Sequence, residues 1–384
     1  MSLIYLDYAA ATPLDPAVLL AMQPYLTTEF YNPSASYAAA RTTRSALEAA
    51  RSQVALCLGC RASEIVFTAG GTEANNLAIH GVMRRYPGAN VVTSAVEHSA
   101  VLKPAAAYPH AVAPVLSDGR LDLTRFAATI TDQTVLVSCM YANNEIGTVQ
   151  PIRALARLLV EQRKIRHQAG NNLPLYLHVD ACQAPNYLDV QVSRLGADMV
   201  SFNGSKIYGP KQTGALFLKG GLRLDPLIFG GGQERGLRSG TENLAGIVGF
   251  ATALRLAVER RHQAVDCLQL LQRYWYRQLS EKLPTAIING SQSHRLPNNI
   301  HLTLPGTDNE RILMQLDAAG IMAAAGSACS ASSQTASSVL AAIGLDDDAA
   351  RSSIRLTMGR GTTQDQVDHT ISTLAGLVGL TNNR

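Results

Sequence analysis

The 384-residue chain predicts an α/β fold, with a mostly parallel sheet in a large domain and a smaller α+β domain after it. Short apolar runs alternate with helical patterns through the first two thirds of the sequence, and the remainder mixes strands and helices. A hydrophobic content of 47% in a chain of this length allows one large core and a second, smaller core. We place the large domain at residues 15–255 and the small domain at residues 1–14 plus 256–384.

Apolar runs of strand length are the expected strands of the sheet. They are Ile65–Thr68, Val91–Ser94, Val135–Met140, Leu175–Val179, Met199–Phe202 and Ala215–Leu218. Their alternation with helical patterns is typical of parallel strands covered by helices. Helical periodicity then runs from Leu244 through Leu283, which predicts a helix that leads into the second domain. Ligands of such sheets bind at the carboxyl ends of the strands, and the polar motifs of this chain fall there.

Composition argues against several classes of function. The formal charge is +4, and no basic run is interleaved with aromatic residues, so we expect no nucleic-acid binding. No leader pattern and no stretch of membrane-spanning length is present, which predicts a cytoplasmic protein outside the membrane. The 6 cysteines are scattered, which predicts reduced thiols. Cys57 and Cys60 have the spacing of a redox or zinc pair, but no second pair completes a zinc site, so we expect no metal.

Lys206 is the most informative residue of the chain, because it lies among glycines and just before a proline, 26 residues after Asp180. A lysine that forms a Schiff base must be neutral part of the time, so it needs a partly desolvated position on rigid backbone. Asp180 follows an apolar run, and a carboxylate there can keep the pyridine nitrogen of pyridoxal phosphate protonated. The pair indicates a pyridoxal-phosphate enzyme, although an exposed loop lysine is the alternative when the pair is taken alone.

The Thr68–Glu73 motif follows a strand and opens a helical pattern. Glycines let the backbone approach a phosphate, Thr72 adds a hydroxyl, and free N–H groups at a helix start complete an anion site. We predict phosphate contacts at Gly71 and Thr72, with further cofactor contacts from Asn203, Ser205 and Thr241. A plain strand-to-helix turn capped by Thr72 explains the motif about as well.

Further polar residues follow the strands. His98 lies just past Val91–Ser94, and we expect it to stack on the pyridine ring and to move protons at the substrate's Cα. A structural histidine is the alternative. Asn143 and Gln183 follow the next two strands, and their amides are predicted to hydrogen-bond the cofactor's phenolic oxygen and the substrate carboxylate. Turn chemistry is the alternative for Asn143.

Arg355 and Cys329 are the residues expected to act on the substrate. Arg355 interrupts a strand-like stretch of the second domain, and a guanidinium is the natural partner of an amino-acid carboxylate, with a solvent-facing edge arginine as the alternative. Cys329 lies in residues 323–338, which are almost entirely small and which we expect to be mobile. A thiolate there could attack the sulfur of a substrate and leave as a persulfide, whereas a buried inert cysteine is the alternative.

As an ordered set, these motifs resemble the cysteine desulfurases of the class V aminotransferase family, the NifS/IscS-like enzymes. The resemblance runs almost end to end. The residues that carry it are Tyr5–Ala10, Asn32–Ser34, Glu64–Thr68, Glu97–His98, Asn143–Gly147, His178–Ala181, Lys206–Lys211, Arg238–Thr241 and Gly326–Cys329.

The resemblance implies the fold type I of pyridoxal-phosphate-dependent transferases, which is aspartate aminotransferase-like. It also implies a homodimer in which Thr241 reaches the partner's phosphate site. The implied reaction converts L-cysteine to L-alanine, parks the sulfur on Cys329, and passes it to an acceptor or scaffold protein for iron–sulfur clusters or thiolated cofactors.

Three departures from the family pattern concern the cofactor site and its surroundings. Ser205 stands where many members have histidine, Asn203 where a hydroxyl residue is common, and Gln212 where glycine is usual. The alternatives are a selenocysteine lyase or another class V enzyme, and a degenerate paralogue that only binds a sulfur-transfer partner. Cys329 separates the desulfurase from a transaminase, which has no need of it.

Overall fold

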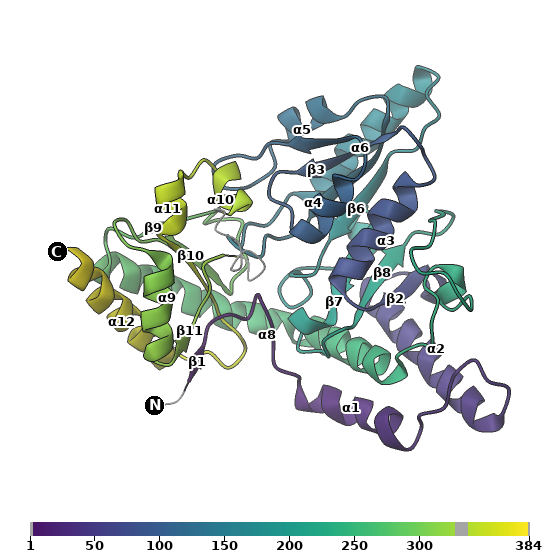
Figure 1. Cartoon of the computed structure of the whole chain (residues 1–384), viewed down its shortest axis with the longest axis horizontal. Helices are drawn as coiled ribbons and strands as arrows, with labels where there is room; N and C mark the ends of the chain where they lie inside the picture. The colour runs from purple at the N-terminus through teal and green to yellow at the C-terminus, as the bar shows by residue number, and fades with distance from the viewer. Residues whose placement is uncertain (1–2, 327–336, 383–384) are drawn as a thin grey trace.

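The computed structural model describes residues 3–326 and 337–382. Its larger part is a sheet covered by helices, and its smaller part combines short sheets with helices (Figure 1). Helix α8 (Leu244–Lys282) runs through both parts, as the helical periodicity predicted. The prediction of an α/β fold with a mostly parallel sheet is confirmed.

The large sheet has 7 strands within the described chain, in the order β2-β8-β7-β6-β5-β3-β4. They are β2 (Ile65–Thr68), β3 (Asn90–Ser94), β4 (His110–Ala113), β5 (Thr134–Met140), β6 (Tyr176–Asp180), β7 (Met199–Asn203) and β8 (Gly214–Leu218). β8 runs antiparallel to both of its neighbours, and the other pairs are parallel. Every apolar run predicted to be a strand is one. β4 was not predicted, because it is a short edge strand with an exposed histidine at its start.

Both faces of this sheet are buried, which explains why its strands read as continuous apolar runs. In β8, Ala215 and Phe217 belong to one core, and Leu216 belongs to the core on the opposite face. The helices around the sheet are α1 (Pro16–Thr27), α2 (Ala38–Leu58), α3 (Gly71–Met83), α4 (Ser99–Ala105), α5 (Leu123–Thr129), α6 (Ile152–Gln168) and α7 (Val192–Leu195). Helices α2 and α6 contribute to the first core and α3 to the second, so each face has its own helical layer.

The smaller part has its own apolar core, in which the end of α8 packs against a three-stranded antiparallel sheet, β12-β10-β9. Trp275 of α8 is fully buried there. Its elements are β1 (Ile4–Tyr5), β9 (Ile287–Ile288), β10 (Asn299–Thr303), β11 (Ile321–Met322), β12 (Ser353–Thr357), α9 (Asn309–Ala318), α10 (Ser338–Ala342), α11 (Asp347–Arg351) and α12 (Gln364–Asn382). The N-terminal strand β1 pairs with β11, which joins the start of the chain to this core.

One stretch of the predicted small domain packs elsewhere. Val339, Leu340, Ile343 and Ala350 belong to the core of the large sheet, whereas Ile321 and Ile354 belong to the core of the smaller part. The residue boundaries at 15–255 and at 1–14 plus 256–384 stay a prediction.

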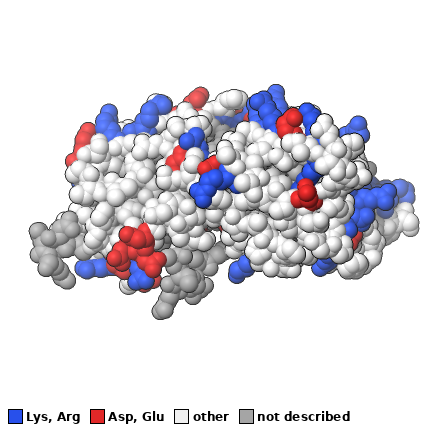
Figure 2. Space-filling view, turned by 90° about the horizontal axis from the view of Figure 1, so that it is seen from above, with Lys and Arg blue, Asp and Glu red and all other residues white. Residues whose placement is uncertain are grey.

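On the face seen in Figure 2, basic side chains lie in several separate places among uncharged residues, and several acidic side chains gather in one cluster at the lower left. The excess of basic residues is therefore not gathered into one patch on this face. Within residues 3–326 and 337–382, no helix has the length and apolar character that crossing a membrane requires.

The turn that follows β5, residues 143–147, contacts the smaller part of the structure. Asn299 of β10 donates from Nδ2 to the Glu145 carbonyl at 2.8 Å, and the backbone N–H of Leu296 donates to the Gly147 carbonyl at 2.9 Å. Gly147 has a φ of +72°, and a Cβ placed on it would lie 2.6 Å from the Asn299 side chain. Only glycine adopts this backbone without strain and also leaves room for Asn299.

Gly147→Ala is expected to lower the melting temperature more than Gly88→Ala does. Both glycines have positive φ, +72° and +82°, so alanine costs about 1–2 kcal/mol of backbone strain at either position. The Cβ at position 88 meets nothing within 4 Å, whereas the Cβ at position 147 collides with Asn299. Thermal unfolding of the two variants measures the difference. If both variants lose the same amount of melting temperature, the tight contact between Gly147 and Asn299 is contradicted.

Candidate active site

A cavity of about 210 Å³ lies at the carboxyl ends of β5, β6 and β7, and the N-terminal segment and β12 close it from the other side. The structure brings most of the predicted site residues together in its wall. Those that line it are Gly71, Thr72, His98, Asp180, Gln183, Asn203, Lys206 and Arg355. Residues of both domains therefore share one cavity.

Lys206 ends a short 3-10 turn, Gly204–Lys206, that directly follows β7. Asn203 begins this turn, because its Oδ1 accepts from the backbone N–H of Ser205 at 3.1 Å. A Cβ on Gly204 would lie 2.8 Å from the Pro210 carbonyl, so the turn closes only with glycine at that position. The half-buried Lys206 Nζ donates to the carbonyl of Ala10 in the N-terminal segment. The lysine is thus held on rigid backbone at the edge of the cavity.

Asp180 ends β6 and is buried, with a hydrogen bond on each carboxylate oxygen. Asn75 of α3 donates from Nδ2 to Asp180 Oδ2 at 2.7 Å. The backbone N–H of Cys182 donates to Asp180 Oδ1 at 3.0 Å. These bonds hold the carboxylate in the cavity wall. Sequence reasoning did not find Asn75, although it lies one helical turn after Gly71 and therefore faces the same side of α3.

The start of helix α3 has the features of an anion site. Gly70 has a φ of +138°, and no side chain caps the helix, so its first N–H groups have no side-chain acceptor. A Cβ on Gly71 would lie 2.5 Å from Cys182 Sγ, so only glycine brings the backbone this close to the cavity. An uncapped helix start, an amine at Lys206 and a carboxylate at Asp180 are groups that fit the phosphate, the aldehyde and the pyridine nitrogen of pyridoxal phosphate. No group of three His, Cys, Asp or Glu side chains that could hold a metal occurs in the described part of the chain.

His98 caps helix α4 with its own ring. Its Nδ1 accepts from the backbone N–H of Ala100 at 3.0 Å, so the neutral ring carries its proton on Nε2. Burial lowers the pKa of His98; the Asp180 carboxylate partly opposes this effect and the Lys206 ammonium adds to it. The cap holds the neutral imidazole in the cavity wall.

Glu97, the residue before His98, is buried beneath the site and was given no role by sequence reasoning. Its Oε1 accepts from the backbone N–H of Met140 at 2.8 Å and from the Ser94 hydroxyl. Its Oε2 has no hydrogen-bond partner among the described residues. Burial raises the pKa of Glu97 to about 8, so the carboxyl group is largely protonated at neutral pH. Glu97 thereby ties the end of β3 to the end of β5 without adding a full charge.

Asn143 does not line the cavity, and its predicted contact with the cofactor and substrate stays a prediction. Its Nδ2 donates to the Val96 carbonyl at 2.9 Å, and its Oδ1 accepts from the backbone N–H groups of Glu145 and Ile146. The amide is fully used in building the turn, which is the turn-chemistry alternative. The adjacent Asn144 lines the cavity instead.

Ser205 and Thr241 also lie outside the cavity of their own chain. The Ser205 hydroxyl donates to Asn203 Oδ1 at 3.0 Å within the local turn. Thr241 is exposed and lines a separate hollow together with Gln212 and Arg238. Neither residue lines the cavity within one chain, and their predicted contacts with the cofactor stay predictions. Gln183 does line the cavity, and its Nε2 donates to the Ala9 carbonyl at 2.9 Å.

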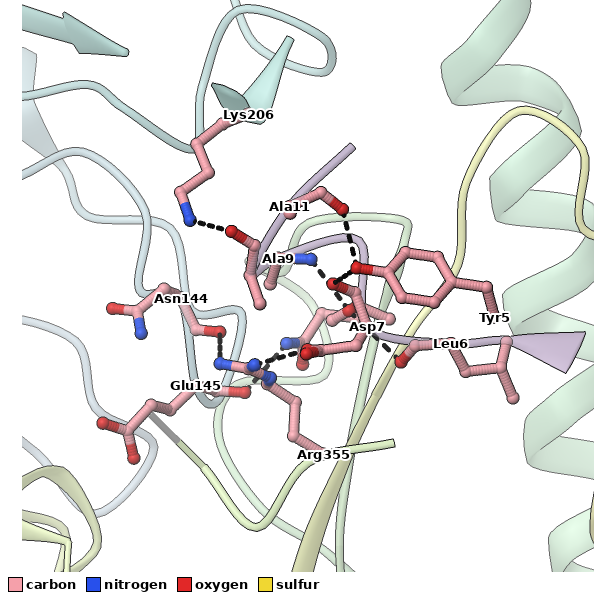
Figure 3. A network of polar contacts seen from close by, with 12 residues as sticks. Tyr5, Leu6, Asp7, Ala9, Ala11, Asn144, Glu145, Lys206 and Arg355 are labelled. Atoms are coloured by element: carbon pink, nitrogen blue, oxygen red, sulfur yellow. Dashed lines mark hydrogen bonds and ion pairs between the residues drawn. The ribbon is translucent and has the colours of Figure 1, made fainter. Parts of the chain in front are cut away.

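Arg355 is buried in β12 rather than facing solvent, with 1% of its surface exposed. It donates from Nη2 to Asp7 Oδ1 at 2.6 Å and from Nη1 to the Asn144 carbonyl at 3.1 Å (Figure 3). Its guanidinium therefore reaches the cavity wall across the domain boundary.

Cys329 lies outside the described residues. The nearest described residues on either side, Gly326 and Ser337, both lie at Glu145. Ser337 donates from Oγ to Glu145 Oε2 at 2.6 Å, and a Cβ on Gly326 would lie 3.1 Å from the same oxygen.

Ligands of open α/β sheets bind at the strand ends where these side chains converge. The molecule is an α/β protein whose candidate site lies between the large sheet and its smaller part. The aminotransferase class-V family model matches residues 4–370, and the chain belongs to this family. The resemblance predicted from the sequence is confirmed.

Named relatives and solved structures match nearly the whole chain. The "Cysteine desulfurase IscS" of Dictyoglomus turgidum is 39% identical over 98% of this chain and 94% of the relative. The "Putative cysteine desulfurase IscS 1" of Bacillus subtilis is 38% identical over 98% of this chain and 99% of the relative. A solved NifS-like protein superposes with a TM-score of 0.90 at 30% identity, covering 98% of this chain and 100% of that chain. The structure entitled "SspA in complex with cysteine" has a TM-score of 0.79 at 32% identity, covering 92% of this chain and 98% of that chain. The predicted fold class is confirmed.

Glu97→Gln is expected to make stability less dependent on pH. The pKa of Glu97 rises from 4.5 to about 8 on folding, so between these values the folded protein holds a proton that the unfolded chain releases. The stabilisation is complete below the unfolded pKa and is lost as pH rises through the folded pKa, at up to about 1.4 kcal/mol per pH unit. The melting temperature of Glu97→Gln relative to the wild type should therefore rise from about pH 5 to about pH 8.

Glu161→Gln is the matched control, because the Glu161 side chain is 65% exposed in a surface ion pair. The melting temperature of Glu161→Gln relative to the wild type should stay constant from about pH 5 to about pH 8. A constant difference for Glu97→Gln as well would contradict the raised pKa.

Proposed function

We propose that the protein is a pyridoxal-phosphate-dependent cysteine desulfurase, which converts L-cysteine to L-alanine and keeps the sulfur as a persulfide on Cys329. The observation that carries the proposal is the convergence of Lys206, Asp180 and the uncapped start of α3 on one cavity that Arg355 reaches from the other domain. Relatives named as cysteine desulfurases over nearly the whole chain support this reading over a selenocysteine lyase or a degenerate binding paralogue.

The coenzyme would be held by groups that the cavity already fixes. Lys206 would bind its aldehyde carbon, Asp180 would face its pyridine nitrogen, and Gly71 and Thr72 at the start of α3 would receive its phosphate. His98 would lie against its ring. When bound, pyridoxal phosphate supplies an electron sink for the bonds at the substrate's Cα.

The side chains around this position have separate tasks. Arg355 binds the substrate carboxylate, because a guanidinium offers paired donors to two oxygens. Lys206 and His98 exchange protons at the substrate's Cα and Cβ, and the lowered pKa of His98 keeps its ring neutral for this purpose. Ala9, Ala10 and Met140 supply apolar surface that limits water in the cavity.

Sulfur transfer is a thiol reaction with balanced atoms and electrons. The Cys329 thiolate attacks the substrate's sulfur, an S–S bond forms, and the Cβ–S bond breaks. The electron pair of the broken Cβ–S bond stays with the carbon skeleton. This skeleton takes up protons and leaves as L-alanine. The sulfur then passes from the Cys329 persulfide to an acceptor.

The setting of the reaction is also a proposal. Thr241 is exposed in the loop that also exposes Phe229, a residue with 77% of its surface accessible. An exposed phenylalanine in this loop supports a homodimer in which Thr241 completes the phosphate site of the partner. We further propose a sulfur-acceptor or iron–sulfur scaffold protein as the partner and the cytoplasm as the location.

Cys329→Ser is expected to abolish alanine and sulfide production from L-cysteine while the visible absorbance of the bound coenzyme stays unchanged. A hydroxyl does not attack sulfur under these conditions, whereas none of the groups proposed to hold the coenzyme is Cys329. Cys267→Ser is the matched control, because Cys267 is exposed and outside the cavity, and it should retain full activity. Normal turnover by Cys329→Ser would refute the assignment.

Borohydride reduction followed by peptide mapping should place the coenzyme on Lys206. Lys206 lines the cavity beside Asp180, whereas the nearby Lys211 donates to the Thr12 carbonyl at 3.4 Å and does not line it. Lys206→Ala should therefore lose the label and Lys211→Ala should keep it. A label on another side chain, or none, would remove the basis of the proposed function.

A further inference from the structure

Asp7 and Arg355 form an ion pair at the wall of the cavity (Figure 3). The distance from Arg355 Nη2 to Asp7 Oδ1 is 2.6 Å, and the side chains are 2% and 19% exposed. Arg355 also donates to the Asn144 carbonyl at 3.1 Å, and its Nε is buried without a partner among the described residues. Since a guanidinium has five N–H groups, this anchoring leaves donors for a further acceptor.

The backbone of Asp7 is itself held in place by the residues around it. Asp7 pairs with Thr357 in a parallel bridge, two residues from Arg355 on β12. The Tyr5 hydroxyl lies 2.9 Å from the Asp7 carbonyl and 2.9 Å from the Ala11 carbonyl, so it closes the turn that follows. Asp7 does not line the cavity, whereas Arg355 does. Asp7 therefore acts on the cavity through Arg355.

The pair has two opposite effects on an incoming carboxylate. Asp7 orients the guanidinium, which favours binding, but it also neutralises the positive charge that attracts the anion. The Coulomb repulsion between two nearby negative charges in a partly buried site is large enough to change affinity measurably.

We propose that Asp7 is a positioning residue for Arg355 that also sets how weakly the cavity binds the carboxylate of its amino-acid substrate. This inference rests on the proposed function, because it takes Arg355 as the group that binds that carboxylate. It assigns Asp7 a part in substrate affinity rather than in stability alone.

Two substitutions of Asp7 separate orientation from charge. Asp7→Asn keeps an oxygen that accepts from Arg355 but removes the negative charge, so the KM for L-cysteine should fall by about 3- to 10-fold with little change in kcat. Asp7→Ala removes the acceptor as well, so Arg355 loses its anchor and the KM should rise by about 10-fold or more. The dissociation constant of L-alanine, measured on the holoenzyme by coenzyme absorbance, should change in the same two directions.

Asp225→Asn is the charge-matched control, because Asp225 pairs with Arg85 at 2.8 Å on the surface, and this variant should leave the KM unchanged. A merely structural role for Asp7 predicts lower melting temperatures for both variants without opposite shifts in KM, and that result would overturn the inference. If Asp7→Ala fails to fold, an unchanged or raised KM in Asp7→Asn still refutes it. Failure of the proposed function is distinguishable from failure of this inference. In the first case the wild type itself would release no alanine from L-cysteine.

Discussion

The docking of the small domain on the turn at residues 143–147 is the contact on which the rest of the site depends. Lys206 follows a strand of the large sheet and Arg355 lies in the small one, so they share a cavity only while the two domains keep this relative position. Three backbone carbonyls of the turn make the contact: Asn144 accepts from Arg355, Glu145 from Asn299, and Gly147 from the backbone of Leu296. Because backbone atoms carry the contact, the turn's own shape decides where the second domain sits.

Electrostatics inside the site follow one rule, which is that each buried polar group needs a partner or must lose its charge. Asp180 has a donor on each oxygen, and Arg355 is matched by Asp7. Glu97 is the buried group that loses its charge. One of its carboxylate oxygens has no partner among the described residues, and burial raises its pKa to about 8, so it stays largely neutral. The site thus keeps charged side chains at Asp180 and Arg355, where a ligand with charged groups would bind.

A second buried ion pair holds the loop that carries Thr241. Arg51 donates to both carboxylate oxygens of Glu234 at 2.8 Å, and the backbone N–H of Phe67 donates to one of them at 2.9 Å. Glu234 and Arg235 both have positive φ, +47° and +57°, a conformation that non-glycine residues adopt at a cost in strain. The pair offsets that strain and fixes the loop beside β2, which gives the exposed Thr241 a defined position at the edge of the large domain.

The sequence by itself determined the large sheet, the long helix, and the residues at the strand ends. Apolar runs, glycines and the residues around Lys206 are local signals. They predict structure from the sequence because burial and turn geometry depend on each short segment separately. Only the tertiary structure decided which polar groups meet. It placed Asn144 rather than Asn143 in the cavity, brought Asn75 to Asp180, and paired Asp7 with Arg355 across 348 positions of the chain. Neighbouring residues of a turn point in different directions, and residues distant in the sequence meet only through packing. Local periodicity therefore predicts neither which residue of a turn faces the cavity nor which distant residues form a pair.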